Sequence, residues 1–265
     1  MTVRSLDIAS TGMQGQQTNV EVISNNIANM NTTGFKRQRA EFQDMLYQTL
    51  ERMGVSSSDQ NTLIPTGIQV GSGVRTGSVY RIMAQGNVQA TENPYDLAVE
   101  GQGFFRVLMP NGETAYSRAG SFNLNATGQL VTADGYTVQP GITVPNNTTE
   151  VTINQSGQVF AKLAGSSTDT NIGQLDLAVF ANEAGLDAQG SSLFKETAAS
   201  GPAQVGTPGT VGFGNIRQGY LELSNVNAVQ EITSLITAQR AYEMNSKVIT
   251  ASDEMMQMTS RLSHG

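Results

Sequence analysis

The sequence predicts an α+β protein in which N- and C-terminal helices form a coiled-coil-like domain and bracket a mainly antiparallel β middle. Seven-residue repeats of apolar residues at both ends of the 265-residue chain predict the helices. Short apolar runs separated by Asn-Gly, Asp-Gly and Ser-Gly pairs predict the β middle.

The N-terminal helix is predicted from Thr2 to about Met30. One apolar column consists of Leu6, Met13, Val20 and Ile27, and the next of Ala9, Gln16, Ile23 and Met30, in which Gln16 is the polar intrusion. Gly34 suits a left-handed cap after the helix. The simpler alternative is an amphipathic helix lying on a globular core. The narrow apolar stripe and the uncharged polar opposite face favour packing against polar surfaces as well.

The C-terminal helix is predicted from about Asn225 to Leu262, a stretch without Gly or Pro. Its apolar residues form three columns, namely Leu235/Tyr242/Ile249/Met256, Ala241/Val248/Met255/Leu262 and Met244/Ala251/Met258. Together the columns cover an arc of roughly 160°, which is wider than one coiled-coil seam requires. This helix is therefore expected to pack against more than one neighbour.

Between the helices, residues 67–214 are predicted to form hairpins. Residues 104–108 and 115–117 flank the first turn, residues 129–132 and 136–138 the second, and residues 151–153 and 159–161 the third. Such spacing is typical of an antiparallel sandwich or barrel. The stretch 197–213, rich in Ala, Ser, Gly and Pro, is predicted to be a return linker.

These features divide the chain into four ranges: residues 1–46, 47–66, 67–214 and 215–265. In the second range, residues 51–65 offer almost nothing to bury. Two interpretations stay open for them: a disordered surface loop, or a strut that reaches an adjacent subunit with Leu63 and Ile64 as its anchors.

Composition excludes several classes of function. The formal charge of −7 argues against nucleic-acid binding. The chain has no Cys and its one His is His264, so neither a catalytic triad, a cofactor site nor a metal site is predicted. Scattered carboxylates leave a glycosidase-type pair as a remote alternative, at Glu92, Asp96, Glu100, Asp134 or Asp176. The sequence predicts neither a Sec-type signal peptide nor a membrane-spanning helix.

Three sequence blocks resemble the signatures of bacterial flagellar rod and hook proteins. They are Ser24–Lys36 (SNNIANMNTTGFK), Gly101–Phe105 (GQGFF) and Gly219–Asn227 (GYLELSNVN), the last followed by Gln239–Lys247 (QRAYEMNSK). The blocks stand in the family's order, and the resemblance covers essentially the whole chain. Its length and the region after the first helix are most similar to the distal rod members. The alternatives are a proximal rod member of similar size and, from another class, a secreted β-domain polysaccharide-active enzyme or adhesin.

The resemblance implies a structural subunit, not an enzyme, that polymerises into a helical tube, transmits torque to the hook and conducts exported subunits. The implied partners are copies of itself, proximal rod proteins, hook protein, a rod-cap protein, peptidoglycan-ring and outer-membrane-ring proteins, and the flagellar type III export apparatus. Neither nucleic acid nor direct membrane insertion is expected. The implied location is the flagellar basal body across the periplasm, reached without a cleaved Sec signal.

The heptad columns and the resemblance together predict which residues form the subunit interface. These residues are Leu6, Met13, Val20, Asn25, Asn26, Ile27, Asn29, Gly34, Phe35, Leu63, Ile64, Asn225, Asn227, Leu235, Arg240, Tyr242, Asn245, Ile249 and Met256.

Overall fold

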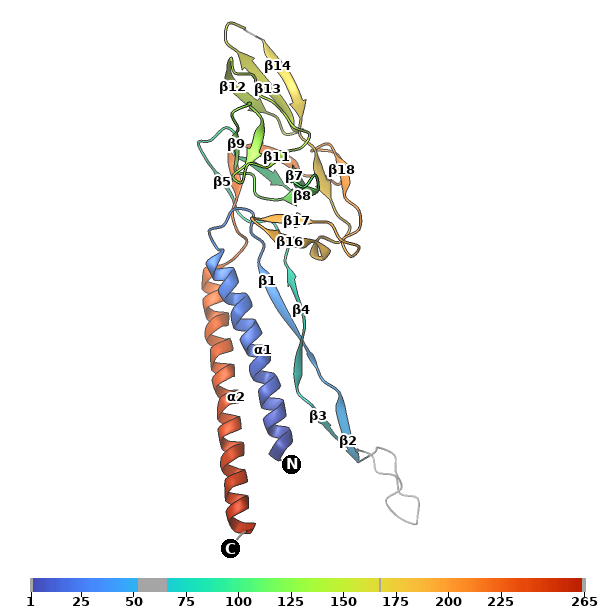
Figure 1. Ribbon diagram of the computed structural model, residues 1–265, viewed down its shortest axis with the longest axis vertical. Coiled ribbons are helices and arrows are strands. Elements are labelled where there is room, and N and C mark those ends of the chain that lie inside the picture. Colours follow the sequence, from blue (N-terminus) through green and yellow to red (C-terminus); the bar gives the residue numbers. More distant parts are fainter. Residues whose placement is uncertain (1, 52–65, 167, 264–265) are drawn as a thin grey trace. The chain divides into compact units, whose positions relative to one another are not determined.

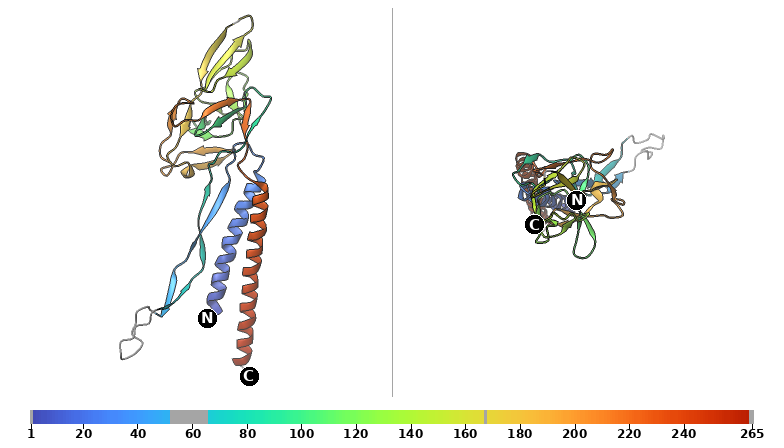
Figure 2. Two further views of the ribbon diagram at one scale, coloured as in Figure 1. Left: turned by 180° about the vertical axis from the view of Figure 1, so that it is seen from behind. Right: turned by 90° about the horizontal axis from the view of Figure 1, so that it is seen from above.

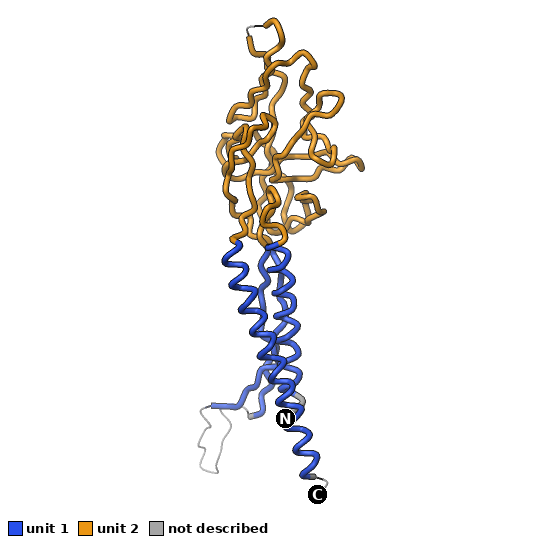
Figure 3. The backbone as a smooth tube through the Cα atoms, turned by 90° about the vertical axis from the view of Figure 1, so that its left-hand side faces the viewer, with its two compact units in different colours: residues 1–27, 38–80, 228–265 blue, residues 28–37, 81–227 orange. Residues whose placement is uncertain are grey.

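The computed structural model describes residues 2–51, 66–166 and 168–263, and the predicted anchors Leu63 and Ile64 lie outside this part of the chain. The chain forms two compact units, coloured in Figure 3. Unit 1 comprises residues 1–27, 38–80 and 228–265, and unit 2 comprises residues 28–37 and 81–227. Each unit is therefore built from segments that are far apart in the sequence.

Unit 1 contains two long helices and a β-hairpin (Figure 1). The helices are α1 (Thr2–Ala28) and α2 (Ala228–Ser263), which run antiparallel side by side. The hairpin has β1 (Gln38–Asp44) paired with β4 (Val74–Arg81), and β2 (Tyr47–Glu51) paired with β3 (Ile68–Gly71). The two predicted terminal helices are thus confirmed, with ends that differ from the prediction by a few residues.

Unit 2 is the predicted antiparallel β middle. Its nine-stranded sheet contains β7 (Phe104–Leu108), β8 (Thr114–Ser117), β9 (Phe122–Leu124), β10 (Leu130–Thr132), β11 (Thr137–Val138), β15 (Leu177–Val179), β16 (Asp187–Gly190), β17 (Leu193–Lys195) and β18 (Gln204–Gly206). Smaller sheets pair β5 (Val88–Ala90) with β20 (Tyr220–Glu222) and β6 (Leu97–Glu100) with β19 (Asn215–Gln218). A three-stranded sheet contains β12 (Thr148–Ile153), β13 (Gln158–Leu163) and β14 (Asp169–Gln174). These strands are labelled in Figure 1 and are seen from behind in the left view of Figure 2.

All three predicted hairpins are present, as β7–β8, β10–β11 and β12–β13. Gly112, Gly135 and Gly157 supply the left-handed residue of the three turns, with φ between 76° and 84°. The predicted return linker is wrong in part, because residues 204–206 form β18 and pair with β15. Composition alone misses such a three-residue strand, since its pairing partner lies far away in the sequence.

The apolar core of unit 2 explains the adjacent Phe104 and Phe105. Successive residues of a strand point to opposite faces, and both rings are buried, one in each of two clusters. Phe105 packs edge-on against Phe122 with ring centroids 5.1 Å apart. Phe104 packs in the same manner against Phe180 and Phe194, at 5.9 and 6.0 Å. Strand β7 therefore contributes one buried ring to each of two apolar clusters, on opposite faces of the nine-stranded sheet.

Candidate assembly interface

The contact between α1 and α2 is centred on a column of small and polar residues. Ser5 Oγ lies 3.1 Å from Ser252 Oγ, and a Cβ on Gly12 would lie 2.8 Å from Asn245 Nδ2. Further along, Asn26 Nδ2 donates to Glu231 Oε2 at 3.0 Å. The members are seven or fourteen residues apart on each helix, so they fall on one face.

Asn26 also ties this helix pair to the hairpin. Its Oδ1 accepts the backbone N–H of Gln38 at 2.8 Å, and its Nδ2 donates to the Gln38 carbonyl at 2.8 Å. Both Asn26 and Glu231 are only 1% exposed. An amide side chain can satisfy the donor and the acceptor of one extended residue simultaneously, which holds β1 against the end of α1.

A second face of α2 is apolar and uncovered. Met244, Val248, Met255, Met258 and Leu262 are 60%, 45%, 50%, 58% and 85% exposed. We call these five residues the outer stripe. At 100° per residue it lies about a third of a turn around the helix from the column that faces α1. The predicted division of α2 between more than one neighbour thus has a structural counterpart within the chain.

The hairpin of unit 1 exposes apolar side chains as well. Leu46, Tyr47 and Leu50 are 87%, 57% and 55% exposed. A groove of about 580 Å³ separates part of the hairpin from α1, and its walls include Gln14, Thr18, Met45, Val74 and Arg75. Packing within the single chain therefore leaves apolar side chains of unit 1 exposed on the hairpin as well as on α2.

Unit 2 brings residues of the three sequence blocks together at a buried group of charges. Lys36 Nζ donates to Glu222 Oε1 at 2.6 Å, and Arg118 Nε lies 3.1 Å from Glu222 Oε2. Lys36, Arg118 and Glu222 are 2%, 4% and 0% exposed. Together with Asn225 we call them the junction cluster.

Backbone contacts complete the junction cluster. Glu222 Oε1 accepts the Gly86 N–H at 2.9 Å, and the Glu222 carbonyl accepts the Gly34 N–H at 2.9 Å. The Arg118 guanidinium donates to the carbonyls of Gly101 and Gly103 and stands 5.7 Å from the centroid of the Phe104 ring. Burial lowers the pKa of Lys36 and of Arg118, and the Glu222 carboxylate opposes that shift in both.

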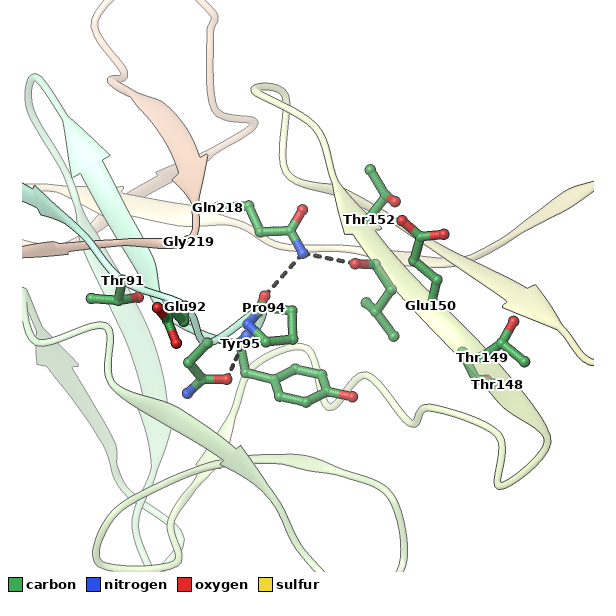
Figure 4. Close-up of a pocket in the computed structure, with 12 residues that line it drawn as sticks. Thr91, Glu92, Pro94, Tyr95, Thr148, Thr149, Glu150, Thr152, Gln218 and Gly219 are labelled. Carbon is green, nitrogen blue, oxygen red and sulfur yellow. Dashed lines mark hydrogen bonds between the residues drawn. The ribbon is translucent and has the colours of Figure 1, made fainter.

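A pocket in unit 2 bears on the remote alternative of a polysaccharide-active enzyme (Figure 4). The pocket has a volume of about 500 Å³, and Glu92 and Glu150 are among its lining residues. Gln218 Nε2 spans it by donating to the carbonyls of Pro94 and Val151, at 2.9 and 2.8 Å. Gln218 therefore links two segments of unit 2 across this pocket.

The other candidate carboxylates are engaged elsewhere. Asp96 accepts hydrogen bonds from Thr91 and Asn93. Glu100 and Asp176 lie 3.7 and 3.8 Å from arginines on neighbouring strands, and Asp134 lies exposed in the β10–β11 turn. Within residues 2–51, 66–166 and 168–263, no group of three or more metal-ligating side chains is found. In that same part of the chain no helix is long and apolar enough to cross a bilayer.

The predicted interface residues fall into distinct environments. Asn26 and Gly34 are buried within the chain, Asn245 lies against Gly12 in the α1–α2 contact, and Asn225 bonds three backbone groups in unit 2. The half-buried ones are Leu6, Met13, Val20, Ile27, Asn29, Phe35, Leu235, Ile249 and Met256. The exposed ones are Asn25, Asn227, Arg240 and Tyr242.

Gly34 differs from its predicted role. It has the expected left-handed φ of 69°, but α1 has already ended at Ala28, and Gly34 lies in the following loop against residue 119. The predicted set also omits Lys36, Arg118, Glu222 and all five residues of the outer stripe. A signal for the stripe was present in the second and third apolar columns of α2. Lys36 and Glu222 are also charged positions inside largely uncharged sequence blocks.

Comparison with known proteins places all three blocks in one family. Residues 6–36 match the model of the flagella basal body rod protein, residues 98–161 that of the flagellar hook protein FlgE/F/G D1 domain, and residues 217–262 that of the flagellar basal body rod FlgEFG protein C-terminal. The chain is similar to flagellar basal-body rod protein FlgG of Caulobacter vibrioides (60% identity, covering 98% of this chain and 99% of the relative). It is also similar to FlgG of Agrobacterium fabrum (53%, covering 98% and 99%) and of Bacillus subtilis (41%, covering 96% and 97%). The chain therefore belongs to the FlgG family of flagellar basal-body rod proteins.

Proposed function

We propose that this chain polymerises with copies of itself through unit 1, and that the outer stripe of α2 is the surface by which neighbouring copies join. The chain is a structural subunit of the flagellar distal rod and not an enzyme. The observation that carries the proposal is the outer stripe itself, five large apolar side chains that the chain leaves in water. A continuous apolar stripe of this kind marks a protein–protein contact.

A second copy of this chain is the partner that fits the outer stripe. The contact between α1 and α2 uses one face of α2 only, and the outer stripe repeats at the same seven-residue spacing on another face. A helix with two such seams packs between two helices, in a coiled-coil-like arrangement. Among the predicted interface residues that are exposed on α2, Arg240 lies beside the outer stripe by helical position, whereas Tyr242 lies on the opposite face.

Polymerisation through unit 1 gives a helical tube whose inner wall consists of the terminal helices. Such a tube transmits torque from the motor to the hook and conducts exported subunits, and it is assembled without a cleaved signal through the flagellar type III export apparatus. The chain assembles with other basal-body components, including rod and hook proteins. Proximal rod proteins, hook protein, a rod-cap protein and the peptidoglycan-ring and outer-membrane-ring proteins are the specific partners proposed. Residues 47–66 are proposed as a rod-type extension toward an adjacent subunit.

The proposal is tested by charges placed on different faces of α2. Met255→Asp introduces a carboxylate into the outer stripe, and Gln239→Asp introduces one on the opposite, exposed face. We expect Met255→Asp to abolish rod polymerisation and motility while the isolated chain unfolds at an unchanged temperature, because Met255 is exposed in the single chain. Gln239→Asp leaves both unchanged.

Ile249→Asp supplies the contrast, because Ile249 is half-buried in the single chain. This substitution is expected to lower the thermal stability of the isolated chain and, through it, polymerisation. Rods assembled at normal length and number by the Met255→Asp chain would show that copies do not join through the outer stripe.

A further inference from the structure

We propose that the junction cluster is the part of unit 2 that takes up force carried along the chain from unit 1. The inference rests on the proposed function, because a subunit that transmits torque has to pass load from one of its units to the other. The chain crosses between the units four times, between residues 27 and 28, 37 and 38, 80 and 81, and 227 and 228. In unit 2 all four crossings end on just three segments: residues 28–37, the start of 81–227, and its end.

The charged part of the junction cluster binds these three segments to one another. Lys36, in the first segment, donates to the Glu222 carboxylate in the third at 2.6 Å and to the Ala84 carbonyl in the second at 3.0 Å. The same carboxylate oxygen accepts the N–H of Gly86 at 2.9 Å. One buried carboxylate and one buried ammonium thus connect every segment through which load can enter unit 2.

Asn225 repeats the connection nearer to the crossings. Its Oδ1 accepts the Arg37 N–H at 2.7 Å, and its Nδ2 donates to the carbonyls of Ile82 and Ala84 at 2.8 and 2.9 Å. Ile82 N–H also donates to the Arg37 carbonyl at 2.8 Å, which links the first and second segments directly. Arg37, Ile82 and Asn225 all lie within a few residues of a crossing.

The cluster is also anchored to the core of unit 2. Arg118 follows β8 and holds the carbonyls of Gly101 and Gly103, which precede β7, while its Nε pairs with Glu222. Glu222 is itself the last residue of β20, which pairs with β5. Load arriving at residues 34–37 or 222–225 therefore passes into two sheets.

Stability alone does not account for charges at this position. Burying three charges is costly, and an apolar group of the same volume is often as stable. Short charge-assisted bonds differ from apolar packing because they are directional, so segments cannot slide past one another without breaking them. Several such bonds loaded side by side share the force, which suits the place where chain segments under load enter a folded unit.

Single-molecule force measurements on the full chain test the inference directly. The chain has no Cys, so Gln257→Cys in α2 and Lys162→Cys in β13 provide specific handles in units 1 and 2. Asn225→Ala removes three hydrogen bonds without burying a charge. Because the loss of one hydrogen bond raises the rate of rupture under force by a factor of several, we expect the lifetime of the junction cluster at constant force to fall at least tenfold. Lys36→Met is expected to shorten the lifetime as well.

Two controls separate a role in resisting force from a general loss of stability. Lys195→Met removes an ion pair of similar length at the surface, with Glu113 at 2.7 Å, and is expected to leave the lifetime unchanged. With both handles in unit 2, at Asp134→Cys and Lys162→Cys, Asn225→Ala leaves the unfolding force unchanged. Equal lifetimes for Asn225→Ala and the parent across the units, or equal losses in both pulling geometries, overturn the inference. Because the measurement uses single chains, its outcome is independent of whether the outer stripe mediates polymerisation.

Discussion

At the scale of single residues, Gly34 combines two constraints that no side chain satisfies. Its φ of 69° lies in the left-handed region, and a Cβ there would lie 2.5 Å from the backbone nitrogen of Ala119. We expect Gly34→Ala to lower the free energy of unfolding by at least about 2 kcal/mol, because backbone cannot move aside as the end of a side chain can. Thermal unfolding monitored by circular dichroism measures the loss.

Gly135→Ala is the matched control for Gly34→Ala. Gly135 has a similar φ of 84°, but no described atom lies within 4 Å of a Cβ built on it. Its substitution therefore reports the backbone cost alone, about 1 kcal/mol. Equal losses of unfolding free energy for the two variants would show that the close approach of residues 34 and 119 does not contribute to the loss in Gly34→Ala.

Glu183 yields a prediction about pH. It lies half-buried beside the junction cluster, where burial raises the pKa of its carboxyl above the ordinary 4.5 and the positive charges of Arg118 and Lys36 offset part of the rise. A carboxyl with a raised pKa in the folded state ionises first in the unfolded state. Its ionisation therefore costs stability as the pH rises from about 4.5 through the folded pKa.

We expect Glu183→Gln to be more stable than the parent at pH 7 and equally stable at pH 4, because Gln resembles the protonated carboxyl. Thermal unfolding at the two pH values checks the difference. A Glu183→Gln chain that is less stable than the parent at pH 7 would mean that attraction to Arg118 and Lys36 outweighs the burial cost.

At the scale of the elements, the α1–α2 contact depends on Asn26. Asn26→Ala removes a donor to the buried Glu231 carboxylate and both bonds to the Gln38 backbone. We expect a loss of about 1–3 kcal/mol in the free energy of unfolding, because three hydrogen bonds of buried or half-buried groups are removed. Ser24→Ala, at an exposed position of the same helix, calibrates the gain in helix propensity and is expected to be near neutral or slightly stabilising. Comparable stabilities of the two variants would contradict the role of Asn26.

The elements show how far sequence patterns reach. Seven-residue spacing predicts both helices, and Gly-containing turns predict three hairpins, because these signals are local. The strand pair β1–β4 went unpredicted, since residues 38–44 and 74–81 find each other across some thirty residues. The sequence prediction places Asn26 at an interface but does not include Ser5 and Gly12, the other members of the polar column on α1. Periodicity identifies apolar faces, whereas this contact relies on small and hydrogen-bonding side chains.

The same limit applies to the junction cluster. Sequence blocks marked Gly34, Lys36 and Glu222 as belonging to special segments, but nothing local shows that a lysine at 36 and a carboxylate at 222 form one buried pair. That pair depends on the strand pairing of β20 with β5, which places Glu222 opposite Val88.

At the scale of the whole molecule, unit 2 is completed by ten residues that precede the hairpin. Residues 28–37 contribute Lys36 and Gly34 to a unit otherwise formed by residues 81–227. Without them, the fully buried Glu222 keeps Arg118 but loses its 2.6 Å partner and a backbone bond to its carbonyl. A chain of residues 28–227 therefore contains all of unit 2, whereas a chain of residues 81–227 lacks the ammonium and the backbone N–H that bond Glu222 from residues 34–36.

We expect the chain of residues 28–227 to unfold cooperatively, and that of residues 81–227 to be less stable by several kcal/mol. Chemical denaturation followed by circular dichroism measures both. Glu222→Gln provides the check on cause. It removes the ion pairs with both Lys36 and Arg118 in the longer chain but only the pair with Arg118 in the shorter one, so we expect a larger loss of stability in the longer chain. Equal stability of the two chains, or equal losses for Glu222→Gln in both, would mean that residues 28–37 cross unit 2 without holding it together.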